Sequence, residues 1–210
     1  MGLYLTGERE ADSLLENDAF ALIIGMVLDQ QVPLERAFSA PLALRQRLGG
    51  HCSVADVAHA PLESLVAAFS EKPALHRFPA AMAERVQRAA LVIEERFGGQ
   101  ADALFAAASG DELFRRIVSL PGFGTQKAQI FVALLGKRLG IRPPGWQEAA
   151  GAFGEPGSFR SVADIDGPEA LAAVRDYKRQ MKAAARSLAQ ATGANAPAPT
   201  VGATRHRARR

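Results

Sequence analysis

Hydrophobic residues recur along most of the chain at the three- and four-residue spacing of amphipathic helices. The clearest case opens at Pro79 and ends at the glycine pair Gly98 and Gly99. Its apolar face carries Met82, Val86, Ala89, Ile93 and Phe97. No segment alternates apolar and polar residues over a sustained run, so the pattern predicts an all-α fold without a sheet of consequence.

The most apolar predicted helix lies near the N-terminus. Asn17 or Asp18 can cap it, and it runs from Ala19 to about Gln31, where Pro33 closes it. Apolar side chains surround its axis, which predicts a buried central helix. The next helix starts at Pro33, is interrupted at Pro41 and continues to Leu48, and further short helices are expected from Ser53, from Pro61, over 102–108 and over 111–119.

The C-terminal third has a different character. Residues 141–161 are rich in proline and glycine and predict a loop-rich excursion with a short helix near 146–150. A final helix is expected over about 168–190, followed by a disordered basic tail over 191–210. The final helix carries the cations Lys178, Arg179, Lys182 and Arg186, which suit either a solvated face or one that meets phosphate.

Composition favours a single folded domain over 1–190, since 48% of the 210 residues are hydrophobic. The net charge of +3 comes from the tail: the last six residues supply four of the 25 lysines and arginines, which leaves 21 against 22 acidic residues. The longest apolar stretch, 19–28, is too short to span a bilayer, and the N-terminus has no signal-peptide pattern. These features predict a cytoplasmic protein with no membrane partner.

Cysteine usage limits the cofactor classes. The single cysteine, Cys52, excludes a disulfide framework and a four-cysteine iron–sulfur cluster. Its neighbour His51 adds a second metal-binding side chain, but two adjacent ligands without partners make a poor metal site. The sequence therefore predicts no cofactor and no metal bound by side chains.

The most informative stretch is 120–128, which reads Leu-Pro-Gly-Phe-Gly-Thr-Gln-Lys-Ala. Pro121 ends the preceding helix, and Gly122 and Gly124 permit positive φ angles and a close approach of another backbone. The stretch thus predicts a hairpin between two helices. A generic tight turn is the alternative for this stretch taken alone.

Three residues of this hairpin have expected roles. Thr125 can cap the second helix, whose free N-terminal amides form an anion-binding site. Phe123 is expected to anchor the turn in the core, and Lys127 to add a charge-assisted contact to phosphate.

The hairpin resembles that of the helix-hairpin-helix–Gly/Pro/Asp (HhH-GPD) superfamily of DNA glycosylases, which reads Leu-Pro-Gly-x-Gly-x-x-x-Ala. Val27-Leu28-Asp29-Gln30-Gln31 resembles the family's helix that ends in Gln-Gln, and residues 70–99 resemble its loop and helix before the hairpin. The resemblance implies two helical lobes around a cleft, a damaged double-stranded DNA as partner, nucleoid association and DNA repair by base excision. We expect a monomer.

The resemblance also implies the contacts to DNA. The expected DNA-binding residues are Gln30, Gln31, Gly122, Phe123, Gly124, Thr125, Gln126 and Lys127. Gln31 would insert its side chain into the gap left by a flipped base, although Gln30 and Gln31 also fit an ordinary polar helix end. The backbone carbonyls of Leu120 and Gly122 would hold a monovalent or divalent cation that meets a phosphate.

The sequence departs from the family pattern at the catalytic positions. The nucleophilic lysine of bifunctional members is replaced by Gln126, and Lys127 points about 100° away on a helix, so no strand-cleaving lyase activity is expected. The family's aspartate would fall at 144–146, which read Pro-Gly-Trp. Glu148 is the nearest acid and Asp29 a second candidate; Glu148 can act in the cleft or lie exposed on a short helix.

Trp146 is the only tryptophan of the chain. It can stack on an extruded base or anchor the excursion in the core. Two functions compete on this pattern: a monofunctional DNA glycosylase that hydrolyses an N-glycosidic bond, and a DNA-damage-binding protein without catalysis. A protein-interaction module on the same fold is a third.

Overall fold

The computed structural model describes residues 2–193 and the side chains up to residue 187, so the predicted tail over 191–210 falls almost entirely outside the described residues. The described chain is all-helical, with no strand between residues 2 and 193. Its α-helices are α1 (Arg9–Asn17), α2 (Ala19–Leu28), α3 (Leu34–Arg47), α4 (Val54–His59), α5 (Leu62–Ser70), α6 (Pro79–Phe97), α7 (Ala101–Phe105), α8 (Gly110–Val118), α9 (Thr125–Arg138), α10 (Trp146–Ala150) and α11 (Pro168–Gly193). Two short 3₁₀ helices, η1 (Gly151–Phe153) and η2 (Val162–Asp164), lie between α10 and α11.

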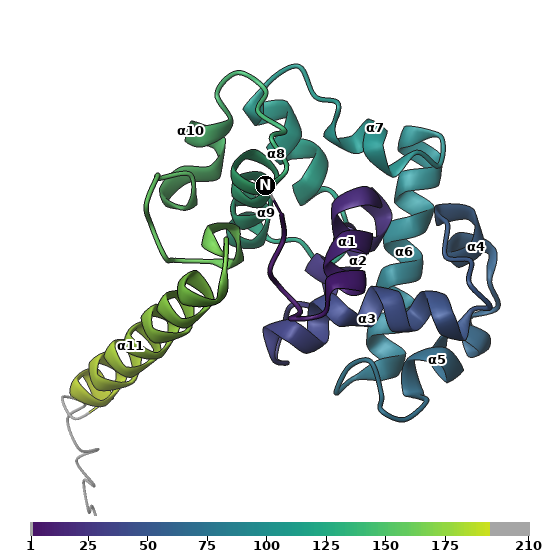
Figure 1. Cartoon of the computed structure of the whole chain (residues 1–210), viewed down its shortest axis with the longest axis horizontal. Coiled ribbons are helices and arrows are strands. Elements are labelled where there is room, and N and C mark those ends of the chain that lie inside the picture. The colour runs from purple at the N-terminus through teal and green to yellow at the C-terminus, as the bar shows by residue number, and fades with distance from the viewer. Residues whose placement is uncertain (1, 194–210) are drawn as a thin grey trace, which may run out of the picture.

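The helices form two packed groups (Figure 1). Helices α1 to α6 pack mainly on one another, and α8, α9, α10 and η2 form a second group around α9. The short α7 contacts α2, α6 and α8, and so connects the groups. In Figure 1, α11 extends away from both groups. None of the described helices has the length and apolar character needed to cross a bilayer.

The central helix is buried as the pattern predicts. The carboxylate of Asp18 accepts the amide of Ala21, so Asp18 is the N-cap, and α2 is buried along its whole length after Ala19. The helix ends at Leu28, earlier than the expected Gln31, because the backbone leaves the helical region at Asp29, whose ψ is 72°, and Gln31 then has a left-handed φ of +56°.

One other expectation at the N-terminal end is wrong, and one helix there was not predicted. Pro41 does not interrupt its helix: α3 is continuous from Leu34 to Arg47. A proline inside a helix removes one hydrogen bond, and here Phe38, Ala40 and Leu44 remain buried in the core on either side of it. Helix α1 has no counterpart among the predicted helices; it is amphipathic, with Ala11 and Leu15 buried.

Elsewhere the predicted elements are present with small shifts of their ends. Ser53 caps α4 through a capping box with Asp56, α6 starts at Pro79, and α10 covers 146–150. The expected helices over 102–108 and 111–119 correspond to α7 and α8. These helices place the hairpin turn between α8 and α9, beside the end of α2.

Candidate nucleic-acid interface

The turn between α8 and α9 packs against the core on one side and faces solvent on the other. Phe123 is buried and stacks on Phe131, with ring centroids 5.7 Å apart and planes inclined by 21°. The carbonyl of Leu120, which is also buried, accepts the amide of Phe123 at 3.2 Å. Gly122 has a φ of +92° and is exposed together with Gly124. Phe123 therefore anchors the turn, as expected, while the two glycines face solvent.

The N-terminus of α9 leaves backbone amides without a side-chain cap. Gly124 is the N-cap, so the expected cap by Thr125 is wrong: Thr125 is the first residue of the helix, and among the described side chains none bonds to this end. The first amides of an α-helix have no intrahelical acceptor. Thr125 and Gln126 are exposed, so this end of α9 can accept an anion.

Lys127 points into the protein. Its Nζ donates to the carbonyl of Val27 at 3.1 Å and lies 5.6 Å from the centroid of the Phe123 ring. Burial lowers the pKa of Lys127 to about 8; the charge of Asp29 opposes this shift and that of Arg85 adds to it. The ammonium expected to reach phosphate is thus bound to the end of α2.

Asp29, the C-cap of α2, lies half-buried between two cations. Burial raises the pKa of its carboxyl group, and the charges of Lys178 and Lys127 partly offset that rise. Lys127 belongs to the hairpin helix and Lys178 to α11, so the three residues join segments that are far apart in the sequence. A carboxyl group whose pKa is raised by burial and that lies close to cations is a candidate for a proton-transfer role.

The two glutamines after Asp29 differ in their surroundings. The Gln30 amide group donates to the carbonyl of Val27 at 2.8 Å and accepts from Nη1 of Arg85 at 3.1 Å, so it is engaged inside the protein. Gln31 is exposed and is the one non-glycine residue with a positive φ in the described part of the chain. Such a conformation costs about 1–3 kcal/mol and points to a functional constraint.

The loop before α6 supplies residues that the sequence reasoning did not assign to the site. His76 is buried, and burial lowers its pKa; Nε2 bonds to the carbonyl of Gln30 at 2.8 Å and Nδ1 accepts the amide of Phe78. This pattern requires a neutral imidazole that donates through Nε2. Phe78 is 44% exposed, with the Arg77 guanidinium 4.7 Å from its ring centroid.

Arg85 of α6 connects this loop region with the hairpin. Besides its bond to Gln30, its side chain lies so close to the turn that a Cβ at Gly122 would come within 2.7 Å of Arg85 Cδ. The only signal for Arg85 and His76 in the sequence was their place in the segment 70–99 that resembles the family.

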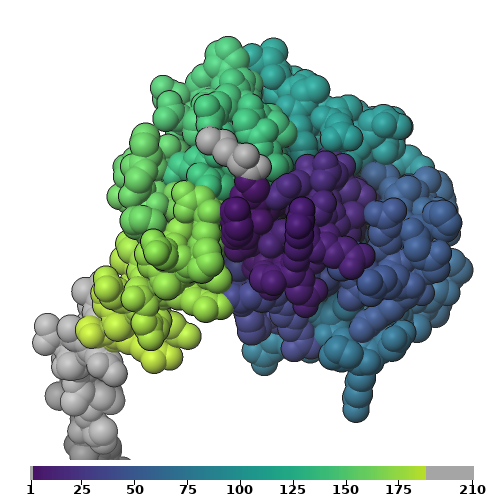
Figure 2. Space-filling model, viewed as in Figure 1, coloured from purple at the N-terminus to yellow at the C-terminus, as the bar shows by residue number. Residues whose placement is uncertain are grey.

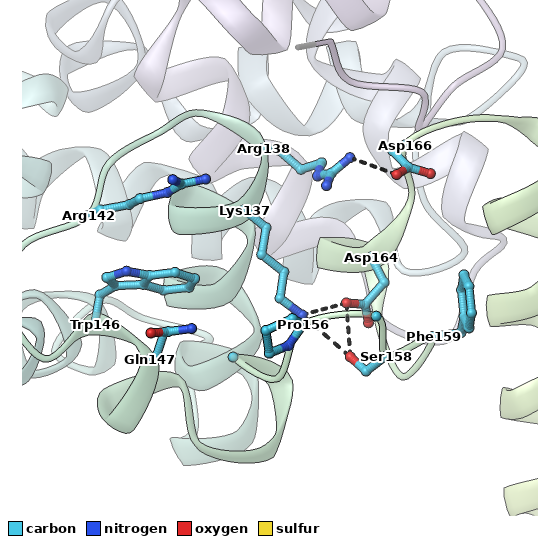
Figure 3. A pocket seen from close by; sticks show the side chains of 12 residues that line it. Lys137, Arg138, Arg142, Trp146, Gln147, Pro156, Ser158, Phe159, Asp164 and Asp166 are labelled. Atoms are coloured by element: carbon cyan, nitrogen blue, oxygen red, sulfur yellow. Dashed lines mark hydrogen bonds and ion pairs between the residues drawn. The ribbon is translucent and has the colours of Figure 1, made fainter.

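Trp146 and Glu148 lie in a different part of the molecule. The Trp146 ring covers Gly136 of α9, where an added Cβ would approach Cε3 to 2.3 Å. It is half-buried and lines a cavity of about 390 Å³ with Arg142, Gln147 and Asp164 (Figure 3). Trp146 thus anchors the excursion, which was one of its two expected roles. Glu148 is exposed on the same short helix.

The hairpin and this cavity lie at opposite ends of α9. The fourteen residues of that helix separate them by roughly 20 Å. Among residues 2–193 no group of three or more His, Cys, Asp and Glu side chains is arranged to hold a metal ion. The cation expected at the carbonyls of Leu120 and Gly122 involves backbone atoms and stays a prediction.

Comparison of the chain with protein-family models, with curated proteins and with solved structures returned no match.

Proposed function

We propose that this chain is a base-excision DNA repair protein, a monofunctional DNA glycosylase with an HhH-GPD-like, two-lobed fold. The observation that carries the proposal is the bond from Lys127 to Val27. It ties α9, whose N-terminal amides have no side-chain cap among the described residues, to the end of α2, where Asp29 is a half-buried carboxyl group with a raised pKa. An anion site and a carboxyl group whose pKa is shifted by burial suit the hydrolysis of a DNA nucleotide.

The surrounding residues have distinct roles in this proposal. The amides of Thr125 and Gln126 bind a phosphate of the damaged strand. Gln31 fills the space left by the flipped nucleotide, and the exposed ring of Phe78 stacks against the opened base step. Gln30 acts indirectly, because its bonds to Arg85 and Val27 hold the end of α2 in place.

Asp29 supplies the general base. As the bond between C1′ and the base nitrogen breaks, its electron pair leaves with the base, and positive charge develops on the sugar. The carboxylate stabilises that charge and accepts a proton from the water whose oxygen attacks C1′. The released base takes up a proton from solvent, and the step needs no metal, cluster or diffusible cofactor.

Lyase chemistry is not part of the proposal. Gln126 occupies the position of the family's nucleophilic lysine, and an amide cannot form a Schiff base. The amine of Lys127 is bound to the carbonyl of Val27. We therefore expect base release without strand cleavage at the resulting abasic site.

One observation favours the alternative, a damage-binding protein without catalysis. Residues 144–146 provide no aspartate, and Glu148 is exposed on α10, about the length of α9 from the hairpin. If Asp29 has no catalytic part, the same amides and wedge residues serve recognition alone.

Release of free bases, detected by mass spectrometry from duplexes with alkylated, oxidised or deaminated bases, separates these functions. We expect release of one base class by the wild type and by Glu148→Gln, and at least a hundredfold slower release by Asp29→Asn. Loss of activity in Glu148→Gln instead would transfer the role to Glu148. Binding to the same duplexes without release from any of them would leave the damage-binding function.

A further inference from the structure

Helix α11 carries a continuous stripe of cations. Arg175, Lys178, Arg179, Lys182 and Arg186 are all exposed. At 100° per residue these five positions fall within an arc of about 100° on the helix surface. The acidic residues of the helix, Glu169 and Asp176, fall outside that arc. We call these five residues the basic stripe.

Contacts within the protein do not account for the whole stripe. Arg175 pairs with Glu35 of α3, and Arg179 pairs with Asp176 one turn back on its own helix. Lys178, Lys182 and Arg186 have no salt bridge to any residue that the structure describes. Three like charges that share one helix face repel one another by a few tenths of a kcal/mol per pair, so an external anion would relieve them.

The stripe begins at the candidate site. The charge of Lys178 on α11 partly offsets the rise that burial causes in the pKa of Asp29, and the charge of Lys127 on the hairpin helix does the same. A groove of about 560 Å³ lies where α11 passes the start of α3, and its lining includes Asp29, Val32, Leu171, Arg175 and Lys178. From there α11 projects outward, as the yellow-green segment of Figure 2 shows.

We propose that the basic stripe binds the phosphate backbone of one DNA strand where that strand leaves the site at Asp29. The inference rests on the proposed function and extends its DNA contact surface. Arg175 and Arg186 lie eleven residues apart, or about 16 Å along the helix axis. Since each strand rises roughly 3.4 Å along the duplex axis per phosphate, this length is sufficient to contact more than one phosphate of a strand.

The remaining faces of α11 favour nucleic acid over a membrane. A helix that binds to a bilayer surface needs a broad apolar face with large side chains opposite its cations. Between residues 176 and 187, α11 has Tyr177 and Met181 as its large apolar residues, and the others are mainly alanine and polar residues. Charge, with little apolar area to bury, is the signature of a phosphate contact.

The salt dependence of DNA binding tests the stripe. Affinity of the full chain for an undamaged fluorescent duplex is measured by anisotropy at several salt concentrations. Each phosphate contact contributes about 0.9 to the slope of log K against log salt, so Lys182→Gln/Arg186→Gln is expected to reduce that slope by about two. Between about 50 and about 200 mM salt, the wild type then loses roughly tenfold more affinity than the variant.

A matched control removes the same charge elsewhere. Arg9 and Arg96 are exposed and lie outside the hairpin, the Asp29 site and α11. We expect Arg9→Gln/Arg96→Gln to keep the wild-type slope, and Lys182→Arg/Arg186→Lys to keep it as well. Equal changes in slope in the two glutamine variants would overturn the proposal, because net charge alone would then explain the effect.

Two further outcomes separate this inference from the proposed function. Base release with an unchanged slope in Lys182→Gln/Arg186→Gln overturns the stripe and leaves the glycosylase proposal intact. If the wild type binds phosphatidylserine vesicles but no duplex, both proposals are overturned. Unchanged helix content by circular dichroism confirms that α11 is still formed in the variants.

Discussion

The Nζ atom of Lys127 lies 3.1 Å from the carbonyl oxygen of Val27, a contact between residues one hundred positions apart that ties the hairpin helix to the end of α2. Burial lowers the pKa of this lysine to about 8, from a usual value of 10.5. Folding therefore favours its neutral form, and the protonated amine is held in the folded state at a cost.

This shift predicts a pH dependence of stability. Below about pH 8 Lys127 is charged in both states. Between that value and 10.5 the unfolded chain binds more protons than the folded one, so stability rises with pH across this window. We expect the Tm of the wild type minus the Tm of Lys127→Met to increase as the pH rises from about 8 to about 10. A constant difference between the two would contradict the buried position of the amine.

Substitution of the two hairpin glycines by alanine is expected to affect stability to different extents. Gly122→Ala places a Cβ at a φ of +92° and 2.7 Å from Arg85 Cδ. We expect it to lower the free energy of unfolding by about 1–3 kcal/mol, chiefly through backbone strain, because the Arg85 side chain can move. Gly124→Ala, with a φ of −90° and open space around the new Cβ, is expected to change it by less than about 0.5 kcal/mol. Urea unfolding measures both; equal effects would show that the turn has another conformation.

Gln31 predicts a conflict between stability and activity. Its φ of +56° favours glycine, so Gln31→Gly is expected to stabilise the protein by up to about 1 kcal/mol. The same variant has no side chain to fill a gap in the duplex, and base release is expected to fall. Gln31→Asn keeps an amide and tolerates the same φ, so it is the matched control, with activity closer to wild type. A Gln31→Gly protein as active as wild type would exclude the wedge role.

The packing of Trp146 on Gly136 predicts strong coupling between the two positions. Gly136→Ala brings a methyl group within 2.3 Å of the indole, and we expect a loss of about 1–3 kcal/mol in stability. In a Trp146→Ala background the same change should cost nothing, because the clash is gone and alanine favours a helix. A double-mutant cycle of urea unfolding gives the coupling. Additive effects would mean that the ring does not cover α9.

Local signals in the sequence were sufficient for much of the fold. Prolines, caps and apolar spacing marked α2, α4, α6 and α10, because these signals act within one turn of the chain. Helix α1 was missed since its nine residues include four charged ones, and its stability comes from Leu15 and Ala11 packing into the core. The predicted interruption at Pro41 was wrong for a related reason. The stabilisation from burying its neighbours outweighs the loss of the one helical hydrogen bond that the proline removes.

The candidate site was predicted only in part. The hairpin and the end of α2 followed from their motifs, whereas the inward direction of Lys127 depends on a carbonyl one hundred residues away. Arg85, His76 and Lys178 reach the site from segments without a motif, so their roles required the tertiary structure. Side-chain direction is set by packing, and spacing along the chain does not encode it.

Asp164 is one of the points at which the excursion between α9 and α11 is attached to α9. Its buried carboxylate accepts from Nζ of Lys137 at 2.6 Å and from the Ser158 hydroxyl (Figure 3). It also accepts from the backbone amides of Arg160 and Ser161. Because η2, which ends at this aspartate, is the main contact of α11 with the rest of the protein, the ion pair fixes the direction in which the long helix leaves the body. The Lys137–Asp164 pair thus determines the direction of α11: without it, we expect that α11 is no longer held in one orientation, and the basic stripe loses its defined position beside Asp29.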